Sequence, residues 1–489
     1  MTWRRGLLAF AGGAATVLAF APFDLYLAGL AGLALLVHLW VRAESPRAAF
    51  RAGFWFGLGL FGCGVSWIYV SLHRYGGIPA PLAAFFTLAF CAFIALFPAA
   101  AGWLQARIAV PAAARACLLI PALWTLFEWL RSWVLTGFPW LAAGYGALDT
   151  PLAGLAPLGG VYAMSLGAML CAGLAWSIFF QTRKFLTASL LVLLVAAGAA
   201  LRSINWSEPM GAVSVSLLQG NVPQDLKFDP ARYARTLETY AHLAEGSRAQ
   251  LIVLPETAVP RFLDALDPGY LERLRAIGRR NGGDLLLGVP VRTAAGEYFN
   301  SAVTLGVSPP QRYDKRHLVP FGEFVPPGTG WAVRALAIPL SDFSRGAREQ
   351  APLAAGGAKL AVNVCYEDAF GEELARQLPE ATLLANLSNV AWFGDSLAPA
   401  QHLQIARARA METGRAQLTA TNTGITAAID RDGRLLGRLP AFAEGRLDLE
   451  VPRYRGATPY VRIGDLGALG AIALLLAACA LLARGGAGR

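Results

Sequence analysis

Residues 81–104 read PLAAFFTLAFCAFIALFPAAAGWL, a run that contains no charged side chain. A helix needs about 20 apolar residues to cross the hydrocarbon core of a bilayer, so this run is long enough for one membrane span. Similar runs lie on both sides of it, at 6–22, 24–41, 53–71, 116–136, 158–180, 186–201 and 463–483. We therefore predict a polytopic α-helical membrane bundle of about eight spans.

The composition of the whole chain also indicates a membrane protein. Hydrophobic residues make up 55% of its 489 residues and charged residues 15%, whereas a soluble domain carries about 25% charged residues. The net charge of +10 could suit nucleic acid. However, the excess is mostly Arg beside apolar segments and forms no basic run, so we expect a membrane partner and no nucleic acid.

The basic residues predict the direction of the spans. They precede the first span, follow the last, and occupy alternate loops: Arg4, Arg5, Arg42, Arg47, Arg51, Arg107, Arg115, Arg183, Lys184, Arg484 and Arg489. With about eight spans these segments share one side, so the positive-inside rule puts both termini in the cytoplasm. Ala19-Phe20-Ala21 also fits a signal-peptidase site, and cleavage there would leave the remaining topology unchanged. The predicted domains are a bundle of spans at 1–201, an extracytoplasmic domain at 202–461, and a last span and tail at 462–489.

Polar and small residues within the apolar runs allow more than one interpretation. Glu128 and Arg131 share one face of a predicted span, so they are either a functional pair at membrane depth or a structural ion pair near the interface. Gly57, Gly59 and Gly62 match GxGxxG. No strand precedes them, and glycines in a membrane span favour close helix packing over nucleotide binding.

The polar part of the chain changes period, from long apolar runs to short β-like runs separated by helical patterns. The β-like runs lie at 213–219, 251–254, 284–289, 301–306, 360–364, 383–387, 418–421, 425–429 and 446–451, and the helical patterns at 231–246, 268–281 and 399–413. Such alternation predicts one α/β domain with layered sheets.

Three segments of this domain end a predicted strand with a reactive side chain. They are Leu251-Ile-Val-Leu-Pro-Glu256, Tyr313-Asp-Lys315 and Ala361-Val-Asn-Val-Cys365. Taken singly, Glu256 could begin a helix, Lys315 could be a surface residue and Cys365 a core residue. Taken together they supply a thiol, a base for its proton and a cation for an oxyanion, which are the parts of covalent acyl chemistry.

The sequence gives little support for a metal site or a cofactor site. The histidines show no metal-ligand spacing, and five of the six cysteines lie in apolar runs, so we expect no metal and no cofactor. His317 remains open as a partner of Cys365. We interpret Gln401 and His402 as ordinary residues of a helix, and no G-x-S-x-G elbow is present.

At these residues the chain resembles the carbon–nitrogen hydrolase (nitrilase) superfamily, whose triad is a Glu after a strand, a Lys and a Cys. Over nearly its whole length it is similar to the membrane branch of that superfamily, the apolipoprotein N-acyltransferases. The motifs that carry the resemblance lie at 67–77, 128–131, 137–140, 219–224, 319–323, 389–396 and 421–426.

The resemblance implies an α-β-β-α sandwich with Glu256, Lys315 and Cys365 as its catalytic residues. Supporting roles fall to Glu323, Tyr366 and Glu367, with Glu367 expected to steady Lys315 or Glu256. The implied substrate-binding positions are Phe228, Trp331, Phe343, Asn389 and Trp392. Phe228 stands where the family often has Trp, so the indole N–H is absent.

The resemblance also implies the reaction and its partners. Cys365 takes the sn-1 acyl chain of a phospholipid, phosphatidylethanolamine, as a thioester and passes it to the α-amine of a diacylglyceryl-cysteine at the N-terminus of a lipoprotein. The enzyme is expected to be a monomer in the bacterial inner membrane, with the catalytic domain in the periplasm. We further expect the apolar segment 324–343 to act as a mobile arm over the site.

Two other functions stay open at this point. A membrane-anchored amidase or hydrolase of a small extracytoplasmic amide would use the same triad, but would need fewer spans. A transporter with an accessory domain is disfavoured, because the predicted spans hold few ionisable groups beyond Glu128 and Arg131.

Overall fold

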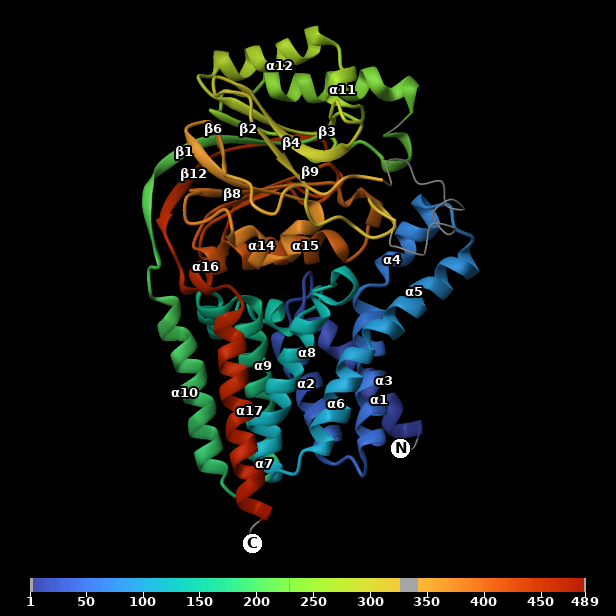
Figure 1. Ribbon diagram of the computed structural model, residues 1–489, viewed down its shortest axis with the longest axis vertical. Helices are drawn as coiled ribbons and strands as arrows, with labels where there is room; N and C mark the ends of the chain where they lie inside the picture. Colours follow the sequence, from blue (N-terminus) through green and yellow to red (C-terminus); the bar gives the residue numbers. More distant parts are fainter. Residues whose placement is uncertain (1–2, 228, 326–341, 488–489) are drawn as a thin grey trace. The chain divides into compact units, whose positions relative to one another are not determined.

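The computed structural model describes residues 3–227, 229–325 and 342–487 (Figure 1). The chain divides into two compact units. One, here the helical unit, takes the chain up to Tyr69, Pro79–Asn205 and the chain from Arg462. The other, here the sandwich unit, takes Trp206–Val461 together with Val70–Ile78, a short segment from the apolar half of the sequence.

Long apolar helices make up the helical unit. They are α1 (Trp3–Thr16), α2 (Tyr26–Val41), α3 (Pro46–Gly64), α5 (Ala80–Ile94), α6 (Leu96–Arg107), α8 (Ile120–Arg131), α9 (Ala156–Phe180), α10 (Lys184–Arg202) and α17 (Leu466–Ala487), with the short α4 (Trp67–Val70) and α7 (Ala112–Ala114). Glycines let α1 and α3 approach closely, since a Cβ at Gly59 would lie 2.1 Å from the carbonyl oxygen of Phe10. The helix-packing interpretation of Gly59 therefore holds.

The predicted number of spans is not confirmed. Within the described residues, five helical stretches are long and apolar enough to cross a membrane, or six if Pro46–Gly64 and the bent continuation Trp67–Tyr75 form one span. The apolar helix Tyr26–Val41 is shorter, and the first predicted run coincides with the 14-residue α1 and a 3-10 turn. A topology of about eight spans stays a prediction.

Glu128 and Arg131 both bind the backbone of one neighbouring loop in the helical unit. A carboxylate oxygen of Glu128 accepts the N–H of Ala143 at 2.9 Å. The Arg131 guanidinium donates to the carbonyl oxygens of Phe138 at 2.5 Å and Trp140 at 2.7 Å. These contacts favour the structural interpretation of the two residues, because each side chain satisfies backbone groups that have left the helix.

The sandwich unit contains two six-stranded sheets. The first has the order β12-β1-β2-β3-β4-β5 and the second β11-β10-β9-β8-β7-β6. The strands are β1 (Ser207–Gln219), β2 (Leu251–Val253), β3 (Asp284–Arg292), β4 (Tyr298–Gly306), β5 (Arg312–Asp314), β6 (Leu353–Ala355), β7 (Ala358–Val364), β8 (Leu383–Ser388), β9 (Gln417–Thr421), β10 (Ala427–Ile429), β11 (Leu435–Arg438) and β12 (Gly445–Gly456).

Helices cover the outer faces of both sheets. Figure 1 shows α11 (Pro230–Glu245) and α12 (Pro268–Arg280) over the first sheet, and α14 (Gly371–Ala375) and α15 (Ala398–Thr413) over the second. Apolar side chains such as Val215, Leu286 and Val362 fill the space between the sheets and are fully buried. The predicted α-β-β-α sandwich is therefore confirmed.

Local sequence explains where the two outer helices begin. Asp229 and Asp267 each cap a helix by accepting a backbone N–H two residues later, and a proline follows each Asp at the first helical position. This Asp-Pro start pre-sets the backbone and satisfies a free donor. The predicted strands match observed ones, including the strand expected before Lys315, but β6 and β11 were missed, because a strand of three or four residues depends on its neighbours more than on its own pattern.

Strand direction brings the reactive positions to the ends of the sheets. The strands β1, β2 and β3 run parallel, as do β7, β8 and β9. Because β5 is antiparallel to β4, which is antiparallel to β3, it ends at the same edge as β2. Glu256 and Lys315 therefore follow strands that end together, while Cys365 directly follows β7 of the facing sheet.

Candidate active site

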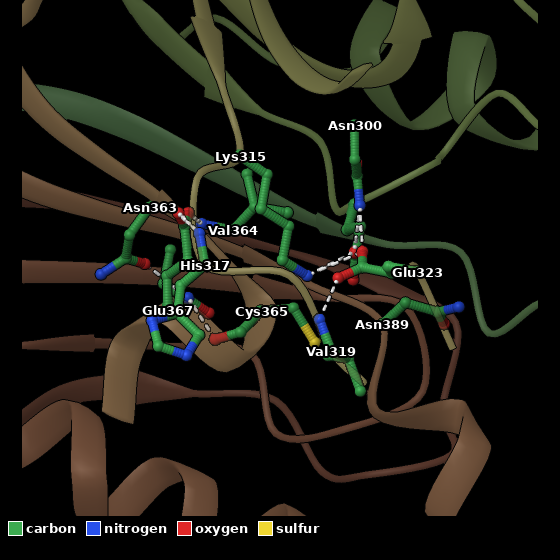
Figure 2. Close-up of polar contacts among 12 residues, drawn as sticks. Asn300, Lys315, His317, Val319, Glu323, Asn363, Val364, Cys365, Glu367 and Asn389 are labelled. Atoms are coloured by element: carbon green, nitrogen blue, oxygen red, sulfur yellow. Dashed lines mark hydrogen bonds and ion pairs between the residues drawn. The ribbon is translucent and has the colours of Figure 1, made fainter. Parts of the chain in front are cut away.

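The structure brings the three predicted catalytic side chains together. The Lys315 ammonium lies 3.6 Å from a carboxylate oxygen of Glu256 and 2.9 Å from one of Glu323. Both Lys315 and Glu256 are buried. Cys365 lies near Lys315 in Figure 2, and both Glu256 and Lys315 act on its thiol. A thiol, a carboxylate and an ammonium thus meet in a region that excludes most water, where charges interact strongly.

The backbone at Cys365 is strained, and contacts to its carbonyl oxygen hold it in place. Its φ of +55° lies in the left-handed region, which costs a non-glycine residue about 1–3 kcal/mol. The Cys365 carbonyl oxygen accepts from the side-chain amide of Asn386 at 3.2 Å and lies 3.4 Å from Nε2 of His402. These contacts fix a sharp turn that presents the thiol at the end of its strand.

Burial keeps the Cys365 thiol protonated at rest. Cys365 as a residue is half-buried. The dense surroundings of the sulfur raise its pKa to about 12; Glu256 adds to the rise and Lys315 opposes it. A thiol in this state can act as a nucleophile only by losing its proton, and Glu256 is a carboxylate close enough to raise the pKa of the thiol.

Lys315 remains charged despite its burial. Burial alone would lower the pKa of its ammonium, yet the carboxylates of Glu323 and Glu256 hold that pKa above its ordinary value. A fixed cation next to the nucleophile can stabilise negative charge on an oxygen. The predicted supporting residue Glu323 thus binds Lys315 directly, and its other oxygen accepts the N–H of Val319 at 2.8 Å.

Asn300 is part of this arrangement and was not predicted from the sequence. Its side-chain amide donates to Glu256 at 2.7 Å and to Glu323 at 2.9 Å (Figure 2). One donor group therefore orients both carboxylates that hold Lys315. The signal in the sequence was weak, because Asn300 is one of several polar residues in strand β4, together with Ser301 and Thr304.

Glu367 holds the backbone beside Lys315, and its expected role of steadying Lys315 or Glu256 stays a prediction. Its carboxylate accepts the N–H groups of Arg316 at 2.7 Å, His317 at 3.0 Å and Val364 at 2.7 Å, as well as the Tyr313 hydroxyl. Burial raises the pKa of Glu367 to about 7, while Lys315 and these N–H groups oppose the rise. Glu367 thereby ties the loop of Lys315 to the strand that ends at Cys365.

The aromatic neighbours of this loop form a stack. Tyr366 packs edge-on against the rings of His317 and Phe370, whose own rings are stacked 3.5 Å apart. His317 also contacts Glu373 through Nδ1 at 3.3 Å. These contacts direct the His317 ring toward Glu373 and Phe370, which favours Glu256 as the base for Cys365.

A buried polar network lies under Cys365 and was also missed. Asn386 donates to Asn363 at 2.5 Å, and both Asn363 and Gln417 donate to the carboxylate of Asp368. His402, interpreted from the sequence as an ordinary helix residue, is buried at the Cys365 carbonyl. These residues come from several strands and one helix, so they come into contact only when the chain folds.

The predicted substrate-binding residues that the structure describes each contact a different part of the sandwich unit. Asn389 donates to Gln224 at 2.8 Å, and the Trp392 ring lies edge-on to Tyr75 at 6.3 Å. The Phe343 ring packs against Tyr298. Phe228 and Trp331 lie outside the described residues, as does most of the predicted arm. Binding of substrate at these positions stays a prediction.

Comparison with known proteins decides the family. Residues 12–174 match the family described as apolipoprotein N-acyltransferase N-terminal domain, and residues 214–460 match carbon-nitrogen hydrolase. The apolipoprotein N-acyltransferase of Nitrosomonas europaea is 47% identical over 99% of this chain and 98% of its own length. The chain belongs to the apolipoprotein N-acyltransferase family.

Further members of the apolipoprotein N-acyltransferase family are similar over the same extent. The enzyme of Methylococcus capsulatus is 44% identical over 97% of this chain and 95% of its own, and that of Chromobacterium violaceum is 46% identical over 97% and 93%. The chain is accordingly an acyltransferase of the carbon–nitrogen hydrolase superfamily, which confirms the resemblance seen in the motifs.

Proposed function

We propose that this membrane enzyme moves an acyl chain from a phospholipid to the α-amine of the N-terminal diacylglyceryl-cysteine of lipoproteins, through a thioester on Cys365. One observation carries the proposal: a protonated thiol meets a carboxylate and a buried ammonium. This combination suits acyl transfer, because the base serves both half-reactions while the cation holds the developing oxyanion.

In the first half-reaction, Glu256 takes the Cys365 proton as the sulfur attacks the sn-1 ester carbonyl. Lys315 and the backbone N–H of Tyr366 stabilise the oxyanion of the tetrahedral intermediate. The intermediate collapses by breaking the ester C–O bond, and Glu256 returns the proton to the departing alkoxide. A lysophospholipid leaves, and the acyl chain remains as a thioester.

In the second half-reaction, the neutral α-amine of the lipoprotein attacks the thioester carbonyl. Glu256 takes a proton from the attacking nitrogen, the C–S bond breaks, and the proton returns to the Cys365 sulfur. The product is an amide and the enzyme is restored. A site that excludes water protects the thioester from hydrolysis between the two steps.

We assign the donor, the location and the oligomeric state as part of the same proposal. The donor is phosphatidylethanolamine, and the enzyme acts as a monomer in the bacterial inner membrane with the sandwich unit in the periplasm. The apolar helices of the helical unit support a membrane location. A lipid substrate makes that location useful, because moving an acyl chain into water costs about 0.8 kcal/mol per CH₂.

The test is to incubate the detergent-solubilised protein with phosphatidylethanolamine and to search for an acyl adduct by intact mass spectrometry. We expect an adduct that hydroxylamine removes and that Cys365→Ala abolishes. The control is Cys63→Ala, since Cys63 is an exposed thiol of the helical unit and its loss should leave the adduct. An adduct that persists in Cys365→Ala would refute the proposal.

A diacylated lipopeptide then decides the acceptor. We expect its addition to discharge the adduct and to yield the triacylated peptide. Release of free fatty acid with no transfer to the peptide would favour a hydrolase over a transferase.

A further inference from the structure

The segment that follows β1 is tied across both sheets. The N–H groups of Asn221 and Val222 donate to Asn422, to its backbone and side-chain oxygens respectively, both at 2.9 Å. The Asn422 side chain donates back to the Val222 carbonyl oxygen at 2.8 Å. Asn422 follows β9 of the second sheet. The motif at 219–224 therefore acts as a clamp between the sheets, a role that the triad does not require.

The clamp continues toward the nucleophile. Gln224 accepts the side-chain amide of Asn389 at 2.8 Å, and the backbone N–H of Asn389 faces the Cys365 sulfur. The position of the chain after Gln224 is thus set relative to Cys365 through Asn389.

Lys227 follows Gln224 in the chain, so the clamp sets its position. Its ammonium is buried, with 3% of the residue exposed, and donates to the backbone carbonyl oxygen of Glu256 at 3.3 Å. Placing an ammonium in the interior is costly unless a negative or polar group compensates it. A lysine held at the backbone of the base is therefore an unusual feature that calls for a functional explanation.

The positive charge of Lys227 lacks the carboxylate partners that neutralise the charge of Lys315 in the described residues. Burial lowers its pKa to about 8, while Glu256 and Cys365 act to raise it, so it is mostly charged at neutral pH. Lys315 is paired with Glu323 and Glu256. Among the residues the structure describes, no carboxylate forms an ion pair with Lys227. Its field therefore acts on the anions that form during the reaction.

We propose that Lys227 is a positioning residue of the acyl-transfer site: it fixes the backbone of Glu256 and supplies a second positive charge that favours the ionised form of Cys365. When the proton passes from Cys365 to Glu256, negative charge moves from the carboxylate to the sulfur, and Lys227 interacts with both groups. It takes no part in bond making. Its use in lipid transfer rests on the proposed function, whereas its effect on the thiol does not.

The test compares Lys227→Met and Lys227→Gln, which remove the charge, with Lys227→Arg, which keeps it. The matched control is Lys359→Met, the same change at an exposed lysine. The first readout is the rate at which iodoacetamide alkylates Cys365 at pH 7, where Lys227 is mostly charged, followed by mass spectrometry of the peptide that contains Cys365. An opposite charge nearby shifts a pKa by about 1–3 units, so we expect alkylation about tenfold slower in both neutral variants.

Rescue by the conservative variant separates the charge from mere packing. We expect Lys227→Arg to alkylate within about threefold of the wild-type rate, and Lys359→Met to match it. A wild-type rate in both neutral variants, or an Arg variant as slow as they are, would overturn the inference. Thermal unfolding midpoints are recorded for all variants, and the comparison uses those whose midpoint equals the wild-type value.

The formation of the acyl adduct from phosphatidylethanolamine is the second readout, and it separates the two proposals. Slower adduct formation in the neutral variants, restored in Lys227→Arg, supports both. If the wild-type protein forms no adduct while the alkylation pattern is as expected, the proposed lipid reaction fails and the effect of Lys227 on the thiol stands.

Discussion

At the scale of single residues, the site is a balance between burial and charge. Burial raises the pKa of the Cys365 thiol and would lower that of the Lys315 ammonium. The opposing charges of Glu256 and Glu323 keep Lys315 ionised, so the cation is in place before any substrate arrives. Catalytic groups that need no reorganisation lower the barrier more than groups that must be assembled during the reaction.

Asn300 offers the sharpest test of this balance. In Asn300→Asp the shape is kept, but the donor to Glu256 and Glu323 becomes a third carboxylate that repels both. Each lost charge-assisted hydrogen bond is worth about 1.5–3 kcal/mol, so we expect acyl transfer to fall at least about 100-fold. The measurement is the rate of transfer to a diacylated lipopeptide.

Asn281→Asp is the control for that change. Asn281 also donates from its side chain to two acceptors, the carbonyl oxygens of Ser247 and Ala249, but it lies outside the site. It should keep the wild-type rate. Equal losses in both variants would mean that Asn300 contributes only to folding.

At the scale of elements, the loop after β8 links several parts of the sandwich unit. It carries Asn389 and the 3-10 turn Val390–Phe393, and Trp392 packs against Tyr75 of the π-helical turn Ser71–Tyr75. The motif at 67–77 overlaps the predicted span at 53–71, yet its residues from Val70 onward belong to the sandwich unit. A helix-like pattern does not reveal such a partner, because the contact is made by residues far apart in sequence.

Gly394 ends this loop and tests its geometry. Its φ of +56° and ψ of −158° suit glycine, and an added Cβ would lie 3.2 Å from Val70. We expect Gly394→Ala to cost about 1–3 kcal/mol and to lower the thermal unfolding midpoint. Gly62→Ala is the opposite case, since that helical glycine has open space around it; its midpoint should stay or rise. A Gly394→Ala midpoint equal to that of the wild type would show that the loop can adopt another conformation.

At the scale of the whole molecule, composition and charge placement carry the membrane argument. In the part of the chain that the structure describes, five or six helices meet the length and hydropathy needed for spanning, fewer than the apolar runs of the sequence. The positive-inside pattern depends on an even number of crossings, so topology is the property that most needs measurement.

Cysteine labelling measures topology directly. In a background with Cys63 and Cys365 replaced, we introduce Cys at Val307, an exposed residue of the sandwich unit, or at Glu44, an exposed residue between α2 and α3. A membrane-impermeant maleimide should label the Val307 position in intact spheroplasts, and the Glu44 position only after lysis. Protection of position 307 in intact spheroplasts would reverse the predicted orientation.

The sequence by itself determined the membrane class, the α/β domain and the three reactive residues, because apolar run length, strand period and short motifs are local properties. Only the tertiary structure decided that Asn300 orients two carboxylates, that Glu367 binds backbone beside Lys315, and that Lys227 lies at Glu256. Their partners are distant in the chain and meet only once the two sheets pack. Helix lengths were decided there too, since a break in an apolar run depends on what packs against it.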